Sequence, residues 1–200
     1  MNGRPAQRGR PRSFDIDRAL GRALEVFWRK GYEATSISDL THAIGINPPS
    51  LYAAFGSKEE LFRQALDRYE AQQAPFWGEA MGASTAYEAI EQLLKGSADR
   101  MSGGETPPGC LFVQGALCGG EECEQVKDEL AARRDAGFRK ILARLKQARR
   151  DGDLPRHLDP VAIARFVITV LHGMAVQAAS GASRTELRRV AETALKIWPQ

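Results

Sequence analysis

Apolar residues in the first third of the chain recur at helical spacing in short stripes, and each stripe begins at a capping residue. A first helix is predicted from Asp15, a candidate N-cap, to Gly31. Its apolar residues fall on one face: Ile16, Leu20, Ala23, Leu24 and Phe27. A second stripe follows Thr35 and Ser36, either of which can cap a helix, and it ends at Gly45. Both stripes therefore predict amphipathic helices.

Two further helices are predicted before Pro75. Pro48 and Pro49 suit a helix start, where a missing N–H costs nothing, and this third helix runs barely two turns. Ser57 opens the fourth helix, with Glu60 three residues on as a capping box. A pair of helices this short on either side of Gly45 is typical of a helix-turn-helix, whose second helix fits the major groove of DNA.

The rest of the chain also has helical punctuation, and it has no strand pattern, internal repeat or low-complexity tract. Glycine pairs at 103–104 and 119–120 separate the segments, and Asp159 with Pro160 is an N-cap followed by proline at the first helical position. The expected helices cover about 84–101, 107–117, 121–150, 159–180 and 184–197. The predicted fold class is therefore all-α.

Composition and charge narrow the class of protein. No apolar run approaches the roughly 18 residues of a membrane span, and the first residues lack a secretion signal, so a cytoplasmic protein is expected. Residues 1–58 hold nine Lys or Arg against five Asp or Glu. Four of these arginines lie among Gly and Pro with no acid between them, at Arg4, Arg8, Arg10 and Arg12. They form either a solvated tail or a basic arm that follows phosphates or enters a minor groove.

The sequence resembles the tetracycline-repressor (TetR) family over roughly its first third. The resemblance rests on the run Gly-Ile-Asn-Pro-Pro-Ser-Leu-Tyr-Ala-Ala-Phe-Gly-Ser-Lys-Glu-Glu-Leu from Gly45 to Leu61, with Phe27, Tyr32 and Leu40 before it. It implies a homodimer with a helix-turn-helix DNA-binding domain in residues 1–58. It further implies a larger helical domain, residues 59–200, that binds a small molecule and dimerises.

Candidate DNA contacts divide into phosphate contacts and base contacts. Thr35 and Ser36 stand at a helix start that suits a phosphate, and Tyr52 and Lys58 can reach the same backbone, as can Arg10 and Arg12 of the arm. Two polar side chains are candidates for base edges or phosphates, and two prolines only for apolar contacts: Asn47, Ser50, Pro48 and Pro49. The alternatives are that Tyr52 is core, Lys58 merely exposed and Thr35 only a cap.

Candidate effector contacts lie near the middle of the C-terminal helices. Gln114, His172 and Gln177 are expected as polar anchors in a largely apolar cavity. The other candidates are aromatic or sulfur-containing: Trp77, Tyr87, Met101, Cys110, Phe138 and Phe166. Such a cavity suits a hydrophobic or aromatic effector. Its binding would favour a spacing of the two DNA-binding heads that no longer matches a palindromic operator, which releases a repressor from double-stranded DNA.

Apolar stripes on the last two helices are candidates for a dimer interface across a two-fold axis. The residues expected there are Phe166, Val170, Met174, Leu187, Val190 and Ala194. The alternative is that these side chains pack within one chain.

Three cysteines raise a second hypothesis, a thiol-based sensor of oxidants or electrophiles that uses Cys110, Cys118 or Cys123. Acidic neighbours of the last two disfavour a thiolate, and no His or Cys cluster has zinc spacing. No phosphate loop or paired-carboxylate signature accompanies Cys110 and His172, so an enzyme, a cofactor and a metal are not expected.

Overall fold

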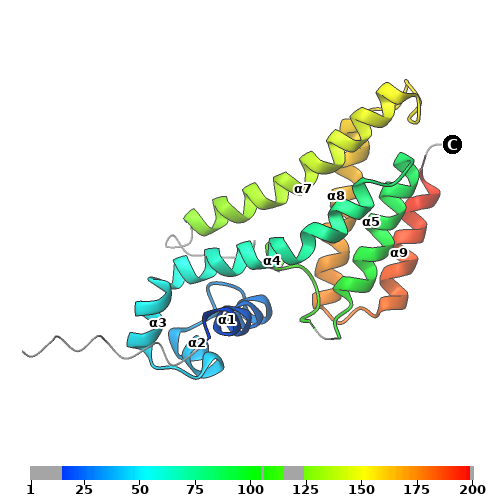
Figure 1. Ribbon diagram of the computed structural model, residues 1–200. Coiled ribbons are helices and arrows are strands. Elements are labelled where there is room, and N and C mark those ends of the chain that lie inside the picture. Colours follow the sequence, from blue (N-terminus) through cyan, green and yellow to red (C-terminus); the bar gives the residue numbers. More distant parts are fainter. Residues whose placement is uncertain (1–14, 105, 115–123, 199–200) are drawn as a thin grey trace, which may run out of the picture.

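The predicted all-helical architecture is confirmed. The computed structural model describes residues 15–104, 106–114 and 124–198, and every regular element within these ranges is a helix (Figure 1). Three helices form an N-terminal head: α1 (Ile16–Lys30), α2 (Ile37–Ile44) and α3 (Pro48–Phe55). The long helix α4 (Lys58–Met81) leads from this head to the C-terminal helices.

The predicted helix starts are confirmed in the head. Asp15 accepts a hydrogen bond from the Asp17 backbone N–H at 2.9 Å. Ser36, rather than Thr35, caps α2 in a reciprocal capping box with Asp39, and Ser57 forms the same motif with Glu60 at the start of α4. These caps satisfy backbone donors that a helix start leaves without an intrahelical acceptor.

The turn between α2 and α3 is held from both sides. Gly45 adopts the left-handed conformation, with φ 81° and ψ 35°, which glycine adopts at little steric cost. Its N–H donates to the Thr41 carbonyl at 2.9 Å. From α1, the Arg22 guanidinium donates to the carbonyls of Ala43 at 3.2 Å and Ile44 at 3.0 Å. This contact ties the C-terminus of α2 to α1.

Helix α4 continues through Pro75, whereas the sequence pattern predicted four helices that end before this proline. Pro75 lies on the exposed side of α4, so the carbonyl that loses its helical donor can face water. Beyond it, Trp77 and Ala80 pack against the C-terminal helices. Their burial stabilises the last turns of α4 despite the lost hydrogen bond.

Five more helices follow α4 in the described ranges: α5 (Ala86–Met101), α6 (Leu111–Gln114), α7 (Glu124–Asp151), α8 (Pro160–Ala179) and α9 (Arg184–Lys196). Four of them match the expected ranges closely. The helix predicted from residue 107 begins only at Leu111, because Gly109 has φ 87° and its N–H donates to the Met101 carbonyl at 2.9 Å. A Cβ at Gly109 would lie 2.9 Å from the Ala175 carbonyl, so this position needs glycine for space as well.

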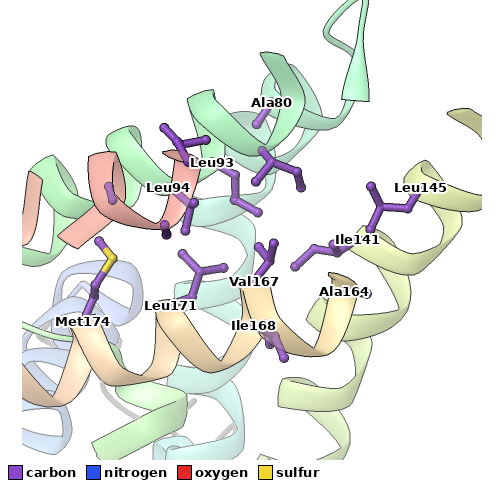
Figure 2. Close-up of a cluster of buried hydrophobic side chains, with 14 of the residues drawn as sticks. Ala80, Leu93, Leu94, Ile141, Leu145, Ala164, Val167, Ile168, Leu171 and Met174 are labelled. Atoms are coloured by element: carbon purple, nitrogen blue, oxygen red, sulfur yellow. The ribbon is translucent and has the colours of Figure 1, made fainter. Parts of the chain in front are cut away.

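Two hydrophobic cores divide the molecule. The first core joins α1–α4 with residues of α6 and α7, and it includes α4 as far as Tyr69. The second core lies among α5, α7, α8 and α9. Figure 2 shows Leu93 and Leu94 of α5 near Val167 and Leu171 of α8. The domain division between residues 58 and 59 stays a prediction, and the first turns of α4 pack with the head.

Helix α8 is long and apolar enough to cross a membrane, with 20 residues and a mean hydropathy of 1.6. This corrects the expectation that no apolar run approaches that length. Only 39% of its most apolar stretch is buried, with Ala164, Val167 and Leu171 in the second core and Phe166 exposed on another side. Apolar residues of α8 therefore lie both in the second core and on exposed sides of the helix, and a single helix of this kind is weak evidence for a membrane span.

The aromatic centre of the first core gives a stability prediction. Phe62 has no exposed surface and packs edge-on against Phe27 at 4.9 Å between ring centroids. Phe62→Ala should lower the free energy of unfolding by about 3–5 kcal/mol, because it leaves a cavity that the neighbouring side chains cannot fill. Urea unfolding followed by tryptophan fluorescence measures this loss. The exposed Tyr52→Ala is the control, and an equal effect of both substitutions would contradict the assigned packing.

Candidate DNA-binding surface and ligand cavity

Helix α3 presents one buried and one exposed face. Leu51 and Phe55 lie in the first core, whereas Tyr52 is 48% exposed. Pro48 and Pro49 are exposed at the start of the helix. The prediction that α3 leaves a face accessible is therefore confirmed, and Tyr52 is not a core residue.

Asn47 has a structural role that the sequence pattern did not reveal. Its side-chain Oδ1 accepts a hydrogen bond from the Ser50 backbone N–H at 2.9 Å, so Asn47 is the N-cap of α3. The amide Nδ2, which only donates, remains available at this exposed position. Asn47 can therefore hold the helix start and present a hydrogen-bond donor at the same time.

Thr35 and Ser36 occupy different environments. Thr35 is 1% exposed, and its hydroxyl donates to the Gly31 carbonyl at 2.6 Å, so this hydroxyl is not available to a phosphate. Ser36 is exposed, but its hydroxyl and its backbone N–H are both bonded to Asp39. Lys30 pairs with the same carboxylate at 2.6 Å and holds the pKa of Asp39 far below its usual value. The polar groups at the start of α2 are therefore already bonded to one another within the protein.

Lys58 begins α4 beside the exposed end of α3. Its ammonium lies 4.4 Å from the ring centroid of Tyr32, where a cation–π interaction positions it. Six of the predicted DNA contacts therefore lie along α3 and at the start of α4: Asn47, Pro48, Pro49, Ser50, Tyr52 and Lys58. Arg10 and Arg12 lie outside the described residues.

A cavity of about 370 Å³ lies where the two cores meet along α4. Trp28 and Tyr69 reach it from the first core, and Ile168 and Leu171 reach it from the second. Its volume is at the low end of the range for small-molecule sites, roughly 300–1,000 Å³. The fold therefore places a ligand-sized space between the head and the C-terminal helices.

The cavity includes four of the nine predicted effector residues: Trp77, Met101, Cys110 and His172. Phe138 is in the second core under the Arg165 guanidinium, and Phe166 and Gln177 are exposed. Tyr87 lies against Trp198 at the far end of α5. Gln114 instead donates to the Pro108 carbonyl at 2.9 Å. These five residues do not line the cavity, because a mid-helix position does not tell which face of the helix a residue occupies.

Charged residues that the sequence pattern did not indicate also line the cavity. Its wall includes four basic residues, Arg100 of α5 and Arg133, Arg134 and Lys140 of α7. It also includes two acids, Glu70 and Asp99. Because α7 is rich in charged residues, the basic ones among them give the pattern of a solvent-exposed helix face, and the sequence did not indicate a cavity there. The wall is mostly apolar, as expected, but more charged groups reach it than the three polar anchors that the sequence suggested.

Burial shifts the pKa of two residues in the cavity wall, His172 and Cys110. It lowers the pKa of His172, and the nearby Arg134 and Arg165 lower it further, so the imidazole is neutral at pH 7. Burial raises the pKa of the Cys110 thiol, which shares a hydrogen bond with Tyr69. Cys110 is therefore a thiol rather than a reactive thiolate at neutral pH. Cys118 and Cys123 lie outside the described residues, and the described His, Cys, Asp and Glu side chains form no group that could hold a metal ion.

The predicted dimer residues divide into two sets. Met174, Leu187 and Ala194 are buried within the chain, in the second core, which corrects their assignment to an interface. Phe166 and Val190 are 40% and 43% exposed, and Val170 is half-buried. An apolar stripe on α8 and α9 thus remains accessible in the single chain.

Comparisons with known proteins agree along nearly the whole chain. The family described as bacterial regulatory proteins, tetR family, matches residues 19–65, and the tetracyclin repressor-like C-terminal domain matches residues 86–194. The HTH-type transcriptional repressor ComR of Escherichia coli K12 is 34% identical over 198 residues, which cover 96% of this chain and 93% of ComR.

Solved structures extend the agreement to the fold. A cysteine mutant of the TetR family regulator CifR, complexed with 26-bp double-strand operator DNA, is 46% identical and has a TM-score of 0.91. The alignment covers 95% of this chain and 100% of CifR. A TetR regulator from Rhodococcus sp. RHA1 is also 46% identical, with a TM-score of 0.63 and a coverage of 91% and 98%. Together with the helix-turn-helix of α2 and α3, these matches establish that the chain belongs to the TetR family of bacterial transcriptional regulators.

Proposed function

We propose that this chain is a cytoplasmic homodimeric repressor that binds a palindromic operator through α2 and α3 and leaves it when a small molecule occupies the cavity. The observation that carries this proposal is the accessible face of α3 between Asn47 and Tyr52, on a helix whose other face is fixed in the first core. The likeness to CifR, which was solved in complex with operator DNA, supports DNA binding by this chain. Neither a cofactor nor a catalytic residue has a part in this activity.

The proposed DNA contacts follow the geometry of the surface. Tyr52 and Lys58 contact phosphates, because a phenol and an ammonium at the rim of the head donate to backbone oxygens without reading sequence. Asn47 and Ser50 contact base edges, and Pro48 and Pro49 contact apolar groups such as a thymine methyl. Thr35 is left out because its hydroxyl is buried and bonded.

The proposed dimer interface is the apolar stripe on the last two helices. Phe166 and Val170 of α8 and Val190 of α9 expose apolar surface that a second copy would cover. Two heads in one dimer would read two half-sites of a palindrome, which a single head cannot do with the same affinity.

Effector release is proposed to pass through α4. The cavity wall includes Tyr69 and Trp77 of this helix, and the start of the same helix carries Lys58. A ligand that binds one position of α4 better than another shifts the population of head spacings in the dimer, since ligands shift an equilibrium only through such differential affinity. Release of DNA follows when the favoured spacing no longer matches the operator.

A thiol-based sensor has less support than a reversible ligand. Cys110 lies in the cavity wall, but burial raises the pKa of its thiol, and a low pKa is what makes a sensor cysteine reactive. Mass spectrometry after mild peroxide treatment, with operator affinity measured on the same sample, distinguishes a thiol-based sensor from a sensor of a reversible ligand. The ligand mechanism predicts that operator affinity is unchanged.

Sequence reading by Asn47 can be separated from its capping role. Asn47→Ser keeps an N-cap oxygen but removes the amide donor, so α3 should stay folded while the preference for the operator over random DNA falls about fivefold. Fluorescence anisotropy with both DNAs measures this ratio. Asn47→Ala, which loses the cap as well, is the comparison. An unchanged preference in Asn47→Ser would refute a base contact by this residue.

Phosphate binding by Tyr52 and Lys58 makes a different prediction. Tyr52→Phe and Lys58→Ala should weaken binding to operator and random DNA by the same factor, about threefold to tenfold, because phosphate contacts carry no sequence information. Lys58→Ala should also reduce the salt dependence of the association constant by about one ion. Lys146→Ala, on the exposed side of α7, is the matched control. A selective loss of operator binding would contradict the assignment.

The proposed interface predicts a change in oligomeric state. Phe166→Glu places a charge in the apolar stripe and should convert the dimer to monomers at micromolar concentration. Analytical ultracentrifugation measures the mass, and circular dichroism checks that the chain stays helical. Val161→Glu, which is exposed near the start of α8 on a different side of the helix, should leave the dimer intact. Dissociation by Val161→Glu alone would overturn the interface.

A further inference from the structure

Aromatic rings and basic groups share the wall of the cavity. Trp28, Tyr69 and Phe112 meet edge-on as a connected set, with ring centroids of successive pairs 4.7 and 4.9 Å apart. On α7, Arg133, Arg134 and Lys140 follow one another around the same space. A wall of this kind can cover a flat apolar body and also face a negative charge.

The two acids of the wall are already neutralised by partners. Glu70 accepts a hydrogen bond from Nη1 of Arg133 at 2.8 Å. Asp99 pairs with Arg184 at 2.8 Å and with Arg188 at 2.6 Å, both from α9. Neither carboxylate therefore balances the remaining basic groups of the cavity.

Arg134 has no such partner in the part of the chain that the structure describes. Its Nη1 donates to the Phe112 backbone carbonyl at 2.7 Å, and no described carboxylate pairs with it. Burial lowers the pKa of its guanidinium, so the charged form has lost part of its hydration. A half-buried cation without a counter-charge costs free energy that an anionic ligand would offset.

Further N–H donors at the wall lack acceptors. Among the described residues, the indole Nε1 of Trp28 and the guanidinium Nε of Arg133 are buried and donate to no acceptor. Nearly every buried donor in a folded protein has an acceptor, so each of these groups requires an explanation. Both nitrogens belong to residues of the cavity wall but have no accessible surface of their own, so the case for an anionic ligand rests on Arg134.

We infer that the cavity binds an aromatic carboxylate, with its ring against Trp28, Tyr69 and Phe112 and its carboxylate on Arg134. This inference rests on the proposed function and gives the chemical class of the effector. A guanidinium matches a carboxylate with two parallel hydrogen bonds, and neutral His172 can donate a further one. A neutral apolar ligand would instead remove the remaining water from Arg134 and supply no counter-charge.

The test compares two ligands that differ in charge and hardly in shape, 2-naphthoate and 2-naphthamide. Isothermal calorimetry on the full-length protein without DNA should give at least about tenfold tighter binding of the naphthoate, because a charge-assisted pair is lost with the amide. Arg134→Met should remove this difference by weakening naphthoate binding alone. Arg134→Lys should restore part of it, since the lysine keeps the charge without the planar fork.

Arg139→Met is the matched control, because Arg139 is an exposed arginine of the same helix that pairs with Asp135. It should bind both compounds as the unmodified protein does. Equal affinity of the unmodified protein for the two compounds, or no binding of either at millimolar concentration, overturns the inference. Equal losses for both compounds in a folded Arg134→Met also overturn it.

Operator affinity measured with and without 2-naphthoate separates this inference from the proposed function. Tight, Arg134-dependent binding that leaves operator affinity unchanged supports the assigned ligand class and contradicts effector release. A protein that fails to bind operator in the absence of any ligand contradicts the proposed function on its own, whatever calorimetry shows for the cavity.

Discussion

The structure depends on one helix that belongs to two cores. Leu61, Phe62 and Leu66 of α4 are fully buried with the head, and beyond Pro75 the same helix packs Trp77 and Ala80 against the C-terminal helices. Because a closely packed interior transmits displacement rather than absorbing it, neither core can move along α4 without an effect on the other. Burial on both sides of Pro75 is what keeps α4 continuous through a residue that ordinarily ends a helix.

The cavity lies at the junction of these two cores, so a ligand bound there would contact both of them. Arg133 of α7 lines it and also pairs with Asp67 and Glu70 of α4, while Arg63 near the start of α4 pairs with Glu129 of α7. A ligand charge near Arg133 and Arg134 would therefore act on groups that already join α4 to α7. The proposed coupling needs no conformational change inside the head, because α4 itself carries the first core.

How much the sequence predicts depends on whether a signal is local. The cap formed by Ser36 with Asp39 and the left-handed turn at Gly45 are properties of a few neighbouring residues, so the helix-turn-helix could be predicted. The family followed from the resemblance of the run from Gly45 to Leu61. The end of α4 could not, because the packing of Trp77 outweighs the local effect of Pro75. The cavity residues could be predicted only in part for the same reason. His172 lines the cavity, Phe138 lies in the second core and Gln177 is exposed, and these differences depend on which helices meet. Arg134 belongs to a helix whose charge pattern is typical of a solvated surface, and its partial burial and its hydrogen bond to the Phe112 backbone carbonyl distinguish it.

A thermodynamic linkage between ligand binding in the cavity and operator binding tests whether α4 couples the two sites. The affinity of the protein for 2-naphthoate should be measured by calorimetry twice, once free and once saturated with operator DNA. We expect at least about fivefold weaker binding to the DNA-bound protein, because two sites that favour different positions of α4 oppose each other reciprocally. Equal affinity in the two states would contradict this coupling, since the two sites would then be independent.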